Sequence, residues 1–192
     1  MDIIKEARKL VTVEIEKYGF PTKLHSEFSE KKALDLADKL SADKTIVNVG
    51  ILLIDVKLGE AITSDKIKDH LKEHVHMSAK AVKQFLKKFD LDKESKDKII
   101  NCVEAHHGGV PFTCKEAEIC ANADSYFFLH PVGFTNALYN SGARNLGYEK
   151  TLNWLHRKLE QKWEMVSLSE VQQELEPYYR QFREIIKKAK ES

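Results

Sequence analysis

The chain has 192 residues, of which 31 are Lys or Arg and 30 are Asp or Glu, so that its formal net charge is +1. A chain without a strong overall charge has no long-range field to attract nucleic acid or an anionic membrane, and we expect neither partner. Eight Gly, four Pro and a charged fraction of 32% favour long amphipathic helices over a turn-rich β protein.

Three features bear on the compartment in which the protein works. The first residues, Met1–Glu6, are charged from the second residue onward and do not resemble a secretory signal. No apolar run reaches the roughly 18–20 residues that cross a bilayer. Cys102, Cys114 and Cys120 are an odd number without C-x-x-C spacing, and we expect reduced core thiols instead of a disulfide or zinc framework. These features predict a cytoplasmic protein.

Apolar residues recur at helical spacing along almost the whole chain, and no segment alternates as a strand would. The predicted helices, in chain order, cover residues 2–18, 27–40, 43–59, 65–72, 77–89, 93–107, 114–129 and 132–143. Two more follow in the tail, where Pro177 should kink or restart the last one. We expect an all-α fold with a helical domain over 1–147 and a C-terminal pair of helices over 148–192 that packs on the same core. The apolar stripes of this pair also allow a homodimer.

The segment Gly50–Val56 (GILLIDV) places a carboxylate after four large apolar residues. From position 46 to 58 most residues are apolar, so that a helix here has no polar face and belongs in the centre of a domain. Asp55 should therefore be buried. A buried carboxylate is costly unless a cation or several hydrogen-bond donors meet it.

Asp124 is the second acidic residue on a nearly all-apolar predicted helix. Cys120 and Ala121 lie about one turn before it, and Phe127 and Phe128 lie about one turn after it, so that its side of the helix is apolar. Two buried aspartates suggest that both converge on a shared cation. The alternative is that each one pairs separately with a Lys or Arg.

Several histidines stand where they could complete a metal site. His106 and His107 end a predicted helix just before Gly108–Gly109, where the chain unwinds and both rings can turn towards one centre. The negative end of that helix also favours a cation. His70 and His74 are four residues apart, a step compatible with metal binding, although an exposed helix face explains that pair equally well.

The order of these residues resembles the HD-domain superfamily of metal-dependent phosphohydrolases, an all-α family named for a consecutive His-Asp pair. The matching motifs run from about residue 20 to 135: His25 with Ala33 and Ala37, ILLIDV with Asp55, HVHMSA at His74–Ala79, EAHHGGVP at Glu104–Pro111, and AEICANADSYFF with Asp124. Ile54 stands where the family has the histidine of its name. The motif that follows also differs, because Val56-Lys57-Leu58 replaces the usual Ile-Gly-Lys.

The resemblance implies that six side chains bind divalent metal: His25, Asp55, His74, His106, His107 and Asp124. In the family pattern His25, Asp55 and Asp124 share a first ion, and the three later histidines hold a second ion or contact a phosphate. The catalytic residues would be Asp55, His74, His106 and His107. The ion is left open among Mg, Mn, Fe, Co, Ni and Zn, and the expected ligand is a small phosphate-containing molecule.

Two functions follow from this pattern. The first is a metal-dependent phosphohydrolase that acts on a nucleotide or another small phosphate ester. The second is an HD-like domain that has lost turnover and serves as a metal-binding, ligand-binding or protein-interaction module. Ile54 supports the second function, because its side chain has no lone pair for a metal. A helical domain with exposed histidines and no site is a third reading.

Overall fold

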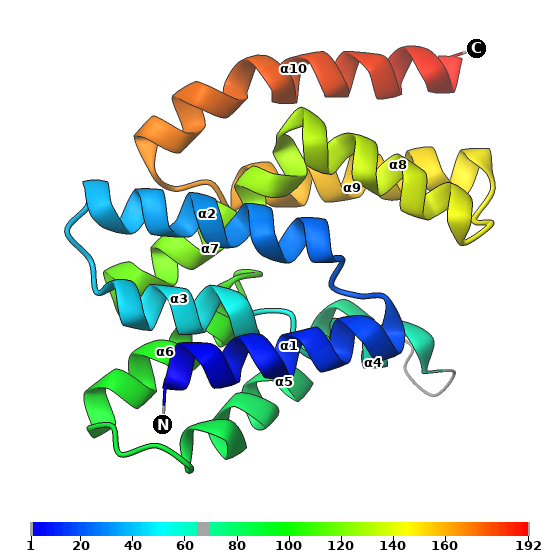
Figure 1. The fold of residues 1–192 in the computed structure, drawn as a ribbon. Coiled ribbons are helices and arrows are strands. Elements are labelled where there is room, and N and C mark those ends of the chain that lie inside the picture. The colour runs from blue at the N-terminus through cyan, green and yellow to red at the C-terminus, as the bar shows by residue number, and fades with distance from the viewer. Residues whose placement is uncertain (1, 65–69, 192) are drawn as a thin grey trace. The chain divides into compact units, whose positions relative to one another are not determined.

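The computed structural model describes residues 2–64 and 70–191, and for residues 70–72 it describes the backbone alone. The described residues form ten helices and no strand, which confirms the all-α prediction (Figure 1). They belong to two compact units, Met1–Ala123 and Asp124–Ser192. Helix α7 (Lys115–Leu129) contributes to both units.

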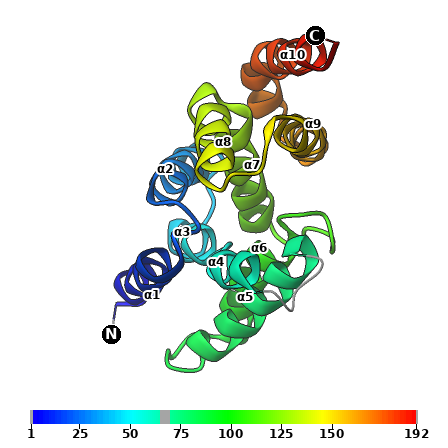
Figure 2. The ribbon, with the colours of Figure 1, turned by 90° about the vertical axis from the view of Figure 1, so that its right-hand side faces the viewer.

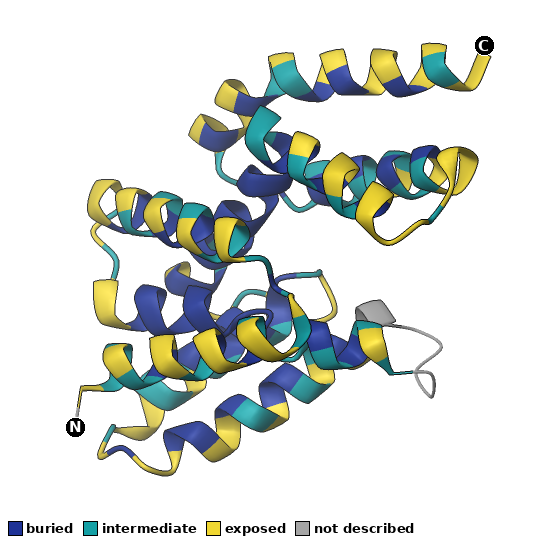
Figure 3. Cartoon of the chain, turned by 45° about the vertical axis from the view of Figure 1, so that its right-hand side comes forward, coloured by how far each residue is buried: buried dark blue, intermediate teal, exposed yellow. Residues whose placement is uncertain are grey.

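The first unit is built around its third helix. Its helices are α1 (Ile3–Tyr18), α2 (Lys23–Lys39), α3 (Lys44–Leu53), α4 (Leu58–Thr63), α5 (His70–Leu86) and α6 (Lys93–Ala105), followed by the first part of α7. Helix α3 packs against α1, α2 and α6 (Figure 2). Every residue from Ile46 to Leu53 is buried, as the dark blue of α3 shows (Figure 3). The apolar segment therefore forms the centre of this unit, as its composition predicts.

Two predicted helix boundaries are wrong. The helix expected over 43–59 is two helices, because α3 ends at Leu53 and a turn over residues 54–57 leads into α4. Asp55 thus lies in a buried turn between helices and not inside one. The break expected between residues 72 and 77 is absent, since α5 runs from His70 to Leu86. Residues 65–69 of the helix expected over 65–72 lie outside the described residues.

Close packing of α3 on α6 depends on Gly50. A Cβ atom at this position would lie 2.7 Å from Cys102 Cβ and 2.8 Å from Cys102 Sγ, so that any side chain would push the two helices apart. Cys102 and Cys120 are buried free thiols, and Cys114 is a partly exposed one. The contact at Gly50 holds α6, which leads into His106, against the helix that leads into Asp55.

The second unit contains the end of α7 with α8 (Pro131–Ala143), α9 (Tyr148–Glu164) and α10 (Ser169–Glu191). Aromatic side chains join these elements. The rings of Phe134 and Phe182 stack with centroids 4.1 Å apart, and Phe128 meets Trp154 edge to face at 5.9 Å. Residues near 128–134 pack on the tail helices in the unit that begins at residue 124, and the domain boundary near 147 stays a prediction.

Helix α10 is amphipathic and packs its buried residues against α9 (Figure 3). It continues through Pro177 as one helix, so that of the two predicted effects of this proline, a kink or a restart, the restart does not occur. None of the described helices combines the length and the apolar character that a bilayer span requires.

Candidate metal centre

Four side chains of the first unit converge on one point. Asp55, His74, His106 and His107 each offer a ligand atom, and these atoms lie within 4.8 Å of one another. Asp55 Oδ1 is 3.1 Å from His74 Nε2 and 3.3 Å from His106 Nε2. The ring of His107 lies 4.1 Å from that of His106 and 5.1 Å from that of His74, centroid to centroid. The structure thus brings together the four residues that the resemblance names as catalytic.

The turn that carries Asp55 is attached to helix α5 by Ser78. The backbone N–H of Lys57 donates to Ser78 Oγ at 3.1 Å, and Ser78 is fully buried. His74 lies one turn before Ser78 on α5, and residues four apart share a helix face. The serine therefore fixes the turn at the place where His74 reaches the carboxylate.

The two adjacent histidines are positioned by the end of α6 and by the segment that follows it. Gly108 has a φ of +74°, and its N–H donates to Ala105 O at 2.9 Å, an arrangement that ends a helix. Asn101 then holds the following chain with two hydrogen bonds. Its Nδ2 donates to Pro111 O at 3.1 Å, and the N–H of Thr113 donates to Asn101 Oδ1 at 2.8 Å.

The hydrogen bonds of His106 define which of its ring nitrogens faces the carboxylate. Its Nδ1 lies 2.7 Å from Val103 O, and because a carbonyl can only accept, Nδ1 carries a proton. In the neutral ring Nε2 then has a lone pair that points towards Asp55 Oδ1, itself an acceptor. Both atoms are buried and make no hydrogen bond to the described residues. Two facing acceptors require a proton or a metal ion between them.

Asp55 is a buried ionised group. It is 5% exposed. Burial raises the pKa of its carboxyl, but His106 and His74, when they carry a proton on the nitrogen that faces it, outweigh burial and hold the pKa well below its usual value. Three imidazoles around one carboxylate form a donor set that suits a transition-metal ion. The residues present therefore fit a metal ion at this cluster.

His25 is the remaining predicted ligand of the first unit. Its Nδ1 lies 3.9 Å from Asp55 Oδ2, and the two residues belong to a second group of possible metal ligands. Ile54 is 3% exposed and apolar, and it offers no donor atom. The first ion of the family pattern thus has fewer ligands in this unit than the second.

Asp124 is the first residue of the second unit, and there it forms an ion pair with Lys162. Both side chains are almost completely buried. The two aspartates therefore differ in what neutralises them. Asp124 contacts a lysine and Asp55 lies among imidazoles, and metal binding by both aspartates stays a prediction.

Asn101 and Lys162 lie outside the quoted sequence motifs, and Ser78 lies inside HVHMSA but was given no role there. The burial of Lys162 was predictable from the sequence, because this residue follows Leu155 and Leu159 at helical spacing and so falls on the apolar stripe of α9. Asn101 contacts Pro111, 10 residues away, and Ser78 contacts Lys57, 21 residues away. No local sequence pattern predicts such contacts.

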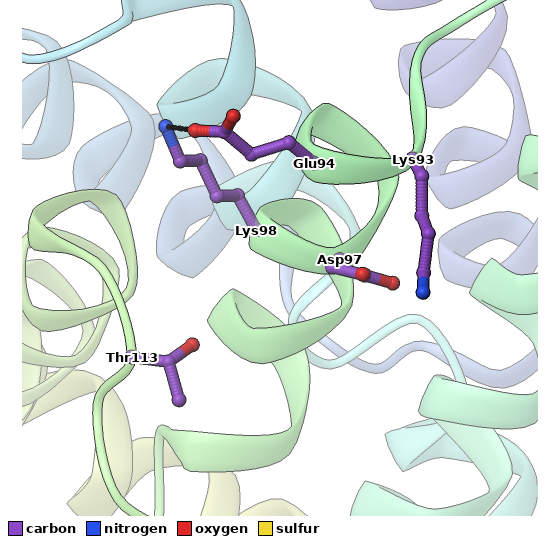
Figure 4. A pocket seen from close by; sticks show the side chains of 5 residues that line it. All are labelled: Lys93, Glu94, Asp97, Lys98 and Thr113. Carbon is purple, nitrogen blue, oxygen red and sulfur yellow. Dashed lines mark ion pairs between the residues drawn. The ribbon is translucent and has the colours of Figure 1, made fainter.

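A surface hollow lies at the start of α6, apart from the predicted ligands. Its lining consists of Lys93, Glu94, Asp97, Lys98 and Thr113 (Figure 4). Lys98 Nζ is 2.7 Å from Glu94 Oε1, so that these charges neutralise each other. None of the lining residues belongs to the candidate ligand set, and the hollow supports no role in metal binding.

The described residues form an all-α fold with a buried group of His and Asp that could hold a metal ion, which is consistent with an HD-like fold. Bacillus subtilis YpgQ in complex with ADP matches with a TM-score of 0.62 and 20% identity over 100% of this chain and 96% of that chain. The selenomethionine form of YpgQ matches with a TM-score of 0.63 and 19% identity over 98% and 95% of the two chains. Structural similarity at 19–20% sequence identity shows that this chain and YpgQ share a fold, and it shows nothing further.

At the level of sequence, the chain is similar to part of a longer protein. Ribonuclease Y of Finegoldia magna is 34% identical over 138 residues, which are 71% of this chain. The chain spans only 24% of the length of that curated relative. No protein-family model matches the chain.

Proposed function

We propose that the protein is a metal-dependent phosphohydrolase of the HD type that acts on a nucleotide or another small phosphate ester. The observation that carries this proposal is the pair of facing acceptors, Asp55 Oδ1 and His106 Nε2, which are 3.3 Å apart, buried and not hydrogen-bonded to described residues. A metal ion bound by both atoms would satisfy their lone pairs at once. His74 and His107 would complete its protein ligands.

The donor set favours some ions over others. Imidazole suits Mn, Fe, Co, Ni and Zn, whereas Mg prefers oxygen ligands and retains several waters. Three imidazoles and one carboxylate therefore argue for a transition-metal ion. A divalent ion at this place would supply positive charge to a phosphoryl oxygen and to the attacking water.

Each protein group has a separate task in this proposal. The carboxylate of Asp55 supplies the negative charge that anchors a cation in an apolar interior. The bond from His106 Nδ1 to Val103 O keeps Nε2 free of a proton and fixes the ring. His107 is partly exposed, while His74 and His106 are buried, so that His107 is the imidazole best placed to meet a phosphate.

The substrate class rests on the relatives. YpgQ was solved with ADP, and we extend a nucleotide ligand from that protein to this chain. The similarity to ribonuclease Y makes an RNA phosphodiester worth testing as well. The net charge of +1 does not favour nucleic acid, and a small nucleotide is the preferred substrate.

A second function, a metal- or ligand-binding module without turnover, is favoured by two observations. Ile54 takes the place of a family ligand with a buried apolar side chain. Lys57 Nζ lies 2.7 Å from Glu14 Oε1 and 2.9 Å from Glu60 Oε2, so that its charge is already neutralised and is withdrawn from phosphate binding. An HD-like domain with these two changes could retain a metal without turnover.

The test measures metal content and phosphate release on the full chain. Purified protein is assayed for bound metal by mass spectrometry, then for phosphate release from ADP and other nucleotides, and for cleavage of a short RNA by gel electrophoresis, each with Mg²⁺, Mn²⁺, Co²⁺ and Ni²⁺. Asp55→Asn and His74→Ala should each lose the metal and all turnover. His76→Ala is the matched control, because His76 is exposed on α5 two residues from His74, and it should behave as wild type.

The outcomes separate the two functions. Metal and phosphate release that disappear together in Asp55→Asn support the hydrolase. Bound metal without release from any substrate supports the binding module. A wild-type protein that binds none of these ions, or Asp55→Asn with unchanged metal content, would falsify the centre itself.

A further inference from the structure

Lys57, at the end of the turn that carries Asp55, is bonded to three helices. Its Nζ lies 2.7 Å from Glu14 Oε1, on helix α1, and 2.9 Å from Glu60 Oε2, on helix α4. Its backbone N–H donates to Ser78 Oγ, on helix α5, at 3.1 Å. The turn is therefore held from three directions at a residue that lies two positions after the carboxylate of the candidate metal centre.

Glu14 is a buried carboxylate outside the candidate ligand set. It is 7% exposed, and it lies one turn before Tyr18 on the side of α1 that packs on α4. The two helices approach closely there, because a Cβ atom on Gly59 would lie 2.5 Å from Tyr18 Cβ and 2.5 Å from Phe20 O. A carboxylate enclosed in such a contact needs a partner of opposite charge, and Lys57 is that partner.

The chain between Lys57 and Asp55 has little freedom to absorb a movement. The N–H of Leu58 donates to Asp55 O at 2.9 Å, and the N–H of Ala61 donates to Lys57 O at 3.0 Å. Val56, the residue between them, is fully buried. Because peptide units are planar and these ones are bonded and packed, a displacement of Lys57 is passed on to Asp55.

The contacts of Asp55 are sensitive to such a displacement. Its Oδ1 lies 3.1 Å from His74 Nε2 and 3.3 Å from His106 Nε2. A metal ion requires its ligand atoms within about 0.2 Å of their ideal distances. Residues that orient metal ligands therefore change metal affinity by about 10–100-fold when they are removed.

We infer that Glu14 is a positioning residue of the candidate metal centre, which acts through Lys57 and holds the turn where Asp55 can bind the ion. Net stability alone does not account for the pair, because desolvation of two partly buried charges offsets most of their attraction. The inference rests on the proposed metal centre, and one of its two experiments uses metal-free protein.

The first experiment measures the affinity of the full chain for Mn²⁺ by titration calorimetry, at a temperature where every variant is folded. Glu14→Gln and Lys57→Met should each bind Mn²⁺ at least ~10-fold more weakly than wild type. The result for Lys57→Met separates positioning from charge, because the loss of a positive charge near a cation would by its field alone tighten binding. Unchanged or tighter binding in Lys57→Met, or unchanged binding in Glu14→Gln, would overturn the inference.

Two variants of α1 serve as controls. Glu16→Gln, at an exposed glutamate of the same helix, should behave as wild type. Arg8→Met removes another ion pair of α1, in which Arg8 Nη1 lies 2.7 Å from Glu30 Oε2 on α2, and it should lower the melting temperature but keep the wild-type affinity for Mn²⁺. If Arg8→Met weakens Mn²⁺ binding as much as Glu14→Gln does, any disturbance of α1 has this effect and the specific role of Glu14 is refuted.

The second experiment records the imidazole nitrogen signals of metal-free protein by NMR. Glu14→Gln should shift the signals of His74 and His106, because the Asp55 carboxylate moves relative to their Nε2 atoms. The signals of His156, on α9, should stay as in wild type. Unchanged signals of His74 and His106 would overturn the inference without any reference to a metal.

The double variant Glu14→Gln/Lys57→Met decides if Lys57→Met alone does not fold, since it leaves no charge on Glu14 to be unpaired. It should bind Mn²⁺ about as weakly as Glu14→Gln, because both substitutions break the same link. Wild-type affinity in the double variant would overturn the inference. A wild type that binds no Mn²⁺ would refute the proposed centre, and the NMR signals would then decide whether Glu14 positions Asp55.

Discussion

Asn101 joins helix α6 to the segment that follows its two terminal histidines, and Asn101→Ala tests whether this link positions them. The side chain is 7% exposed and makes hydrogen bonds of 3.1 Å to Pro111 O and 2.8 Å from the N–H of Thr113. Each bond contributes about 1 kcal/mol net. Pro111 and Thr113 are exposed, so that water can reach the groups that the substitution releases. We expect a loss of about 2 kcal/mol, which lowers the melting temperature by about 4–8 °C.

Metal binding should suffer more than this loss of stability. Residues that orient metal ligands typically change metal affinity by about 10–100-fold when they are removed. We therefore expect Asn101→Ala to bind Mn²⁺ at least ~10-fold more weakly in titration calorimetry at a temperature where it is fully folded. Asn101→Asp keeps the acceptor for Thr113 but loses the donor to Pro111, and its affinity should lie between those of the alanine variant and wild type.

Asn140→Ala provides the control for this prediction. Its Nδ2 donates to Asn136 O at 2.7 Å within helix α8, a local bond of the second unit. This variant should lose no more than about 1 kcal/mol and bind Mn²⁺ as wild type does. If Asn101→Ala melts lower but keeps the wild-type affinity for Mn²⁺, then Asn101 merely stabilises the fold, and the reasoning that links it to the histidines is refuted.

Two further pairs of substitutions test how the site is supported. Gly50→Ala should cost about 2 kcal/mol in denaturant unfolding, because its new methyl group meets Cys102 Cβ at 2.7 Å, whereas Gly142→Ala meets nothing within 4 Å and should be neutral or stabilising. Equal effects of the two would contradict the close approach of α3 and α6. Ser78→Ala should cost about 1 kcal/mol and weaken Mn²⁺ binding, because the turn bearing the site carboxylate loses its bond to α5. Ser29→Ala is its control, since that buried hydroxyl makes no hydrogen bond to described residues; weaker Mn²⁺ binding in both variants would argue against the role of Ser78.

Burial at the centre of the first unit was predictable from the sequence, but the place where the central helix ends was not. A segment that is apolar on every side must be buried, whatever the chain does next, and this argument placed Asp55 in the interior. The end of α3 at Leu53 depends on the turn over residues 54–57, and that turn bonds to Ser78. Local periodicity carries no information about a partner 21 residues away.

The division of the chain into compact units at residue 124 also depends on contacts between residues that are distant in the sequence. The sequence of α8 looks like a continuation of the preceding helices, and nothing local connects it with the tail. The connection is made by aromatic pairs across about 26 to 48 residues, such as Phe128 with Trp154 and Phe134 with Phe182. Pairing of this kind follows from packing in three dimensions.

The state of Lys57 decides which groups are left to meet a phosphate. Burial lowers the pKa of Lys57, but its bonds to Glu14 and Glu60 outweigh burial and raise the pKa, so that the lysine is charged and held between two carboxylates. One cation between two anions has no positive field to offer a substrate. Hydrolysis would therefore require the metal ion and the partly exposed His107 to provide the positive charge, while a binding module would not. Because Lys57 is neutralised by Glu14 and Glu60, the properties of the metal centre decide between a hydrolase and a binding module.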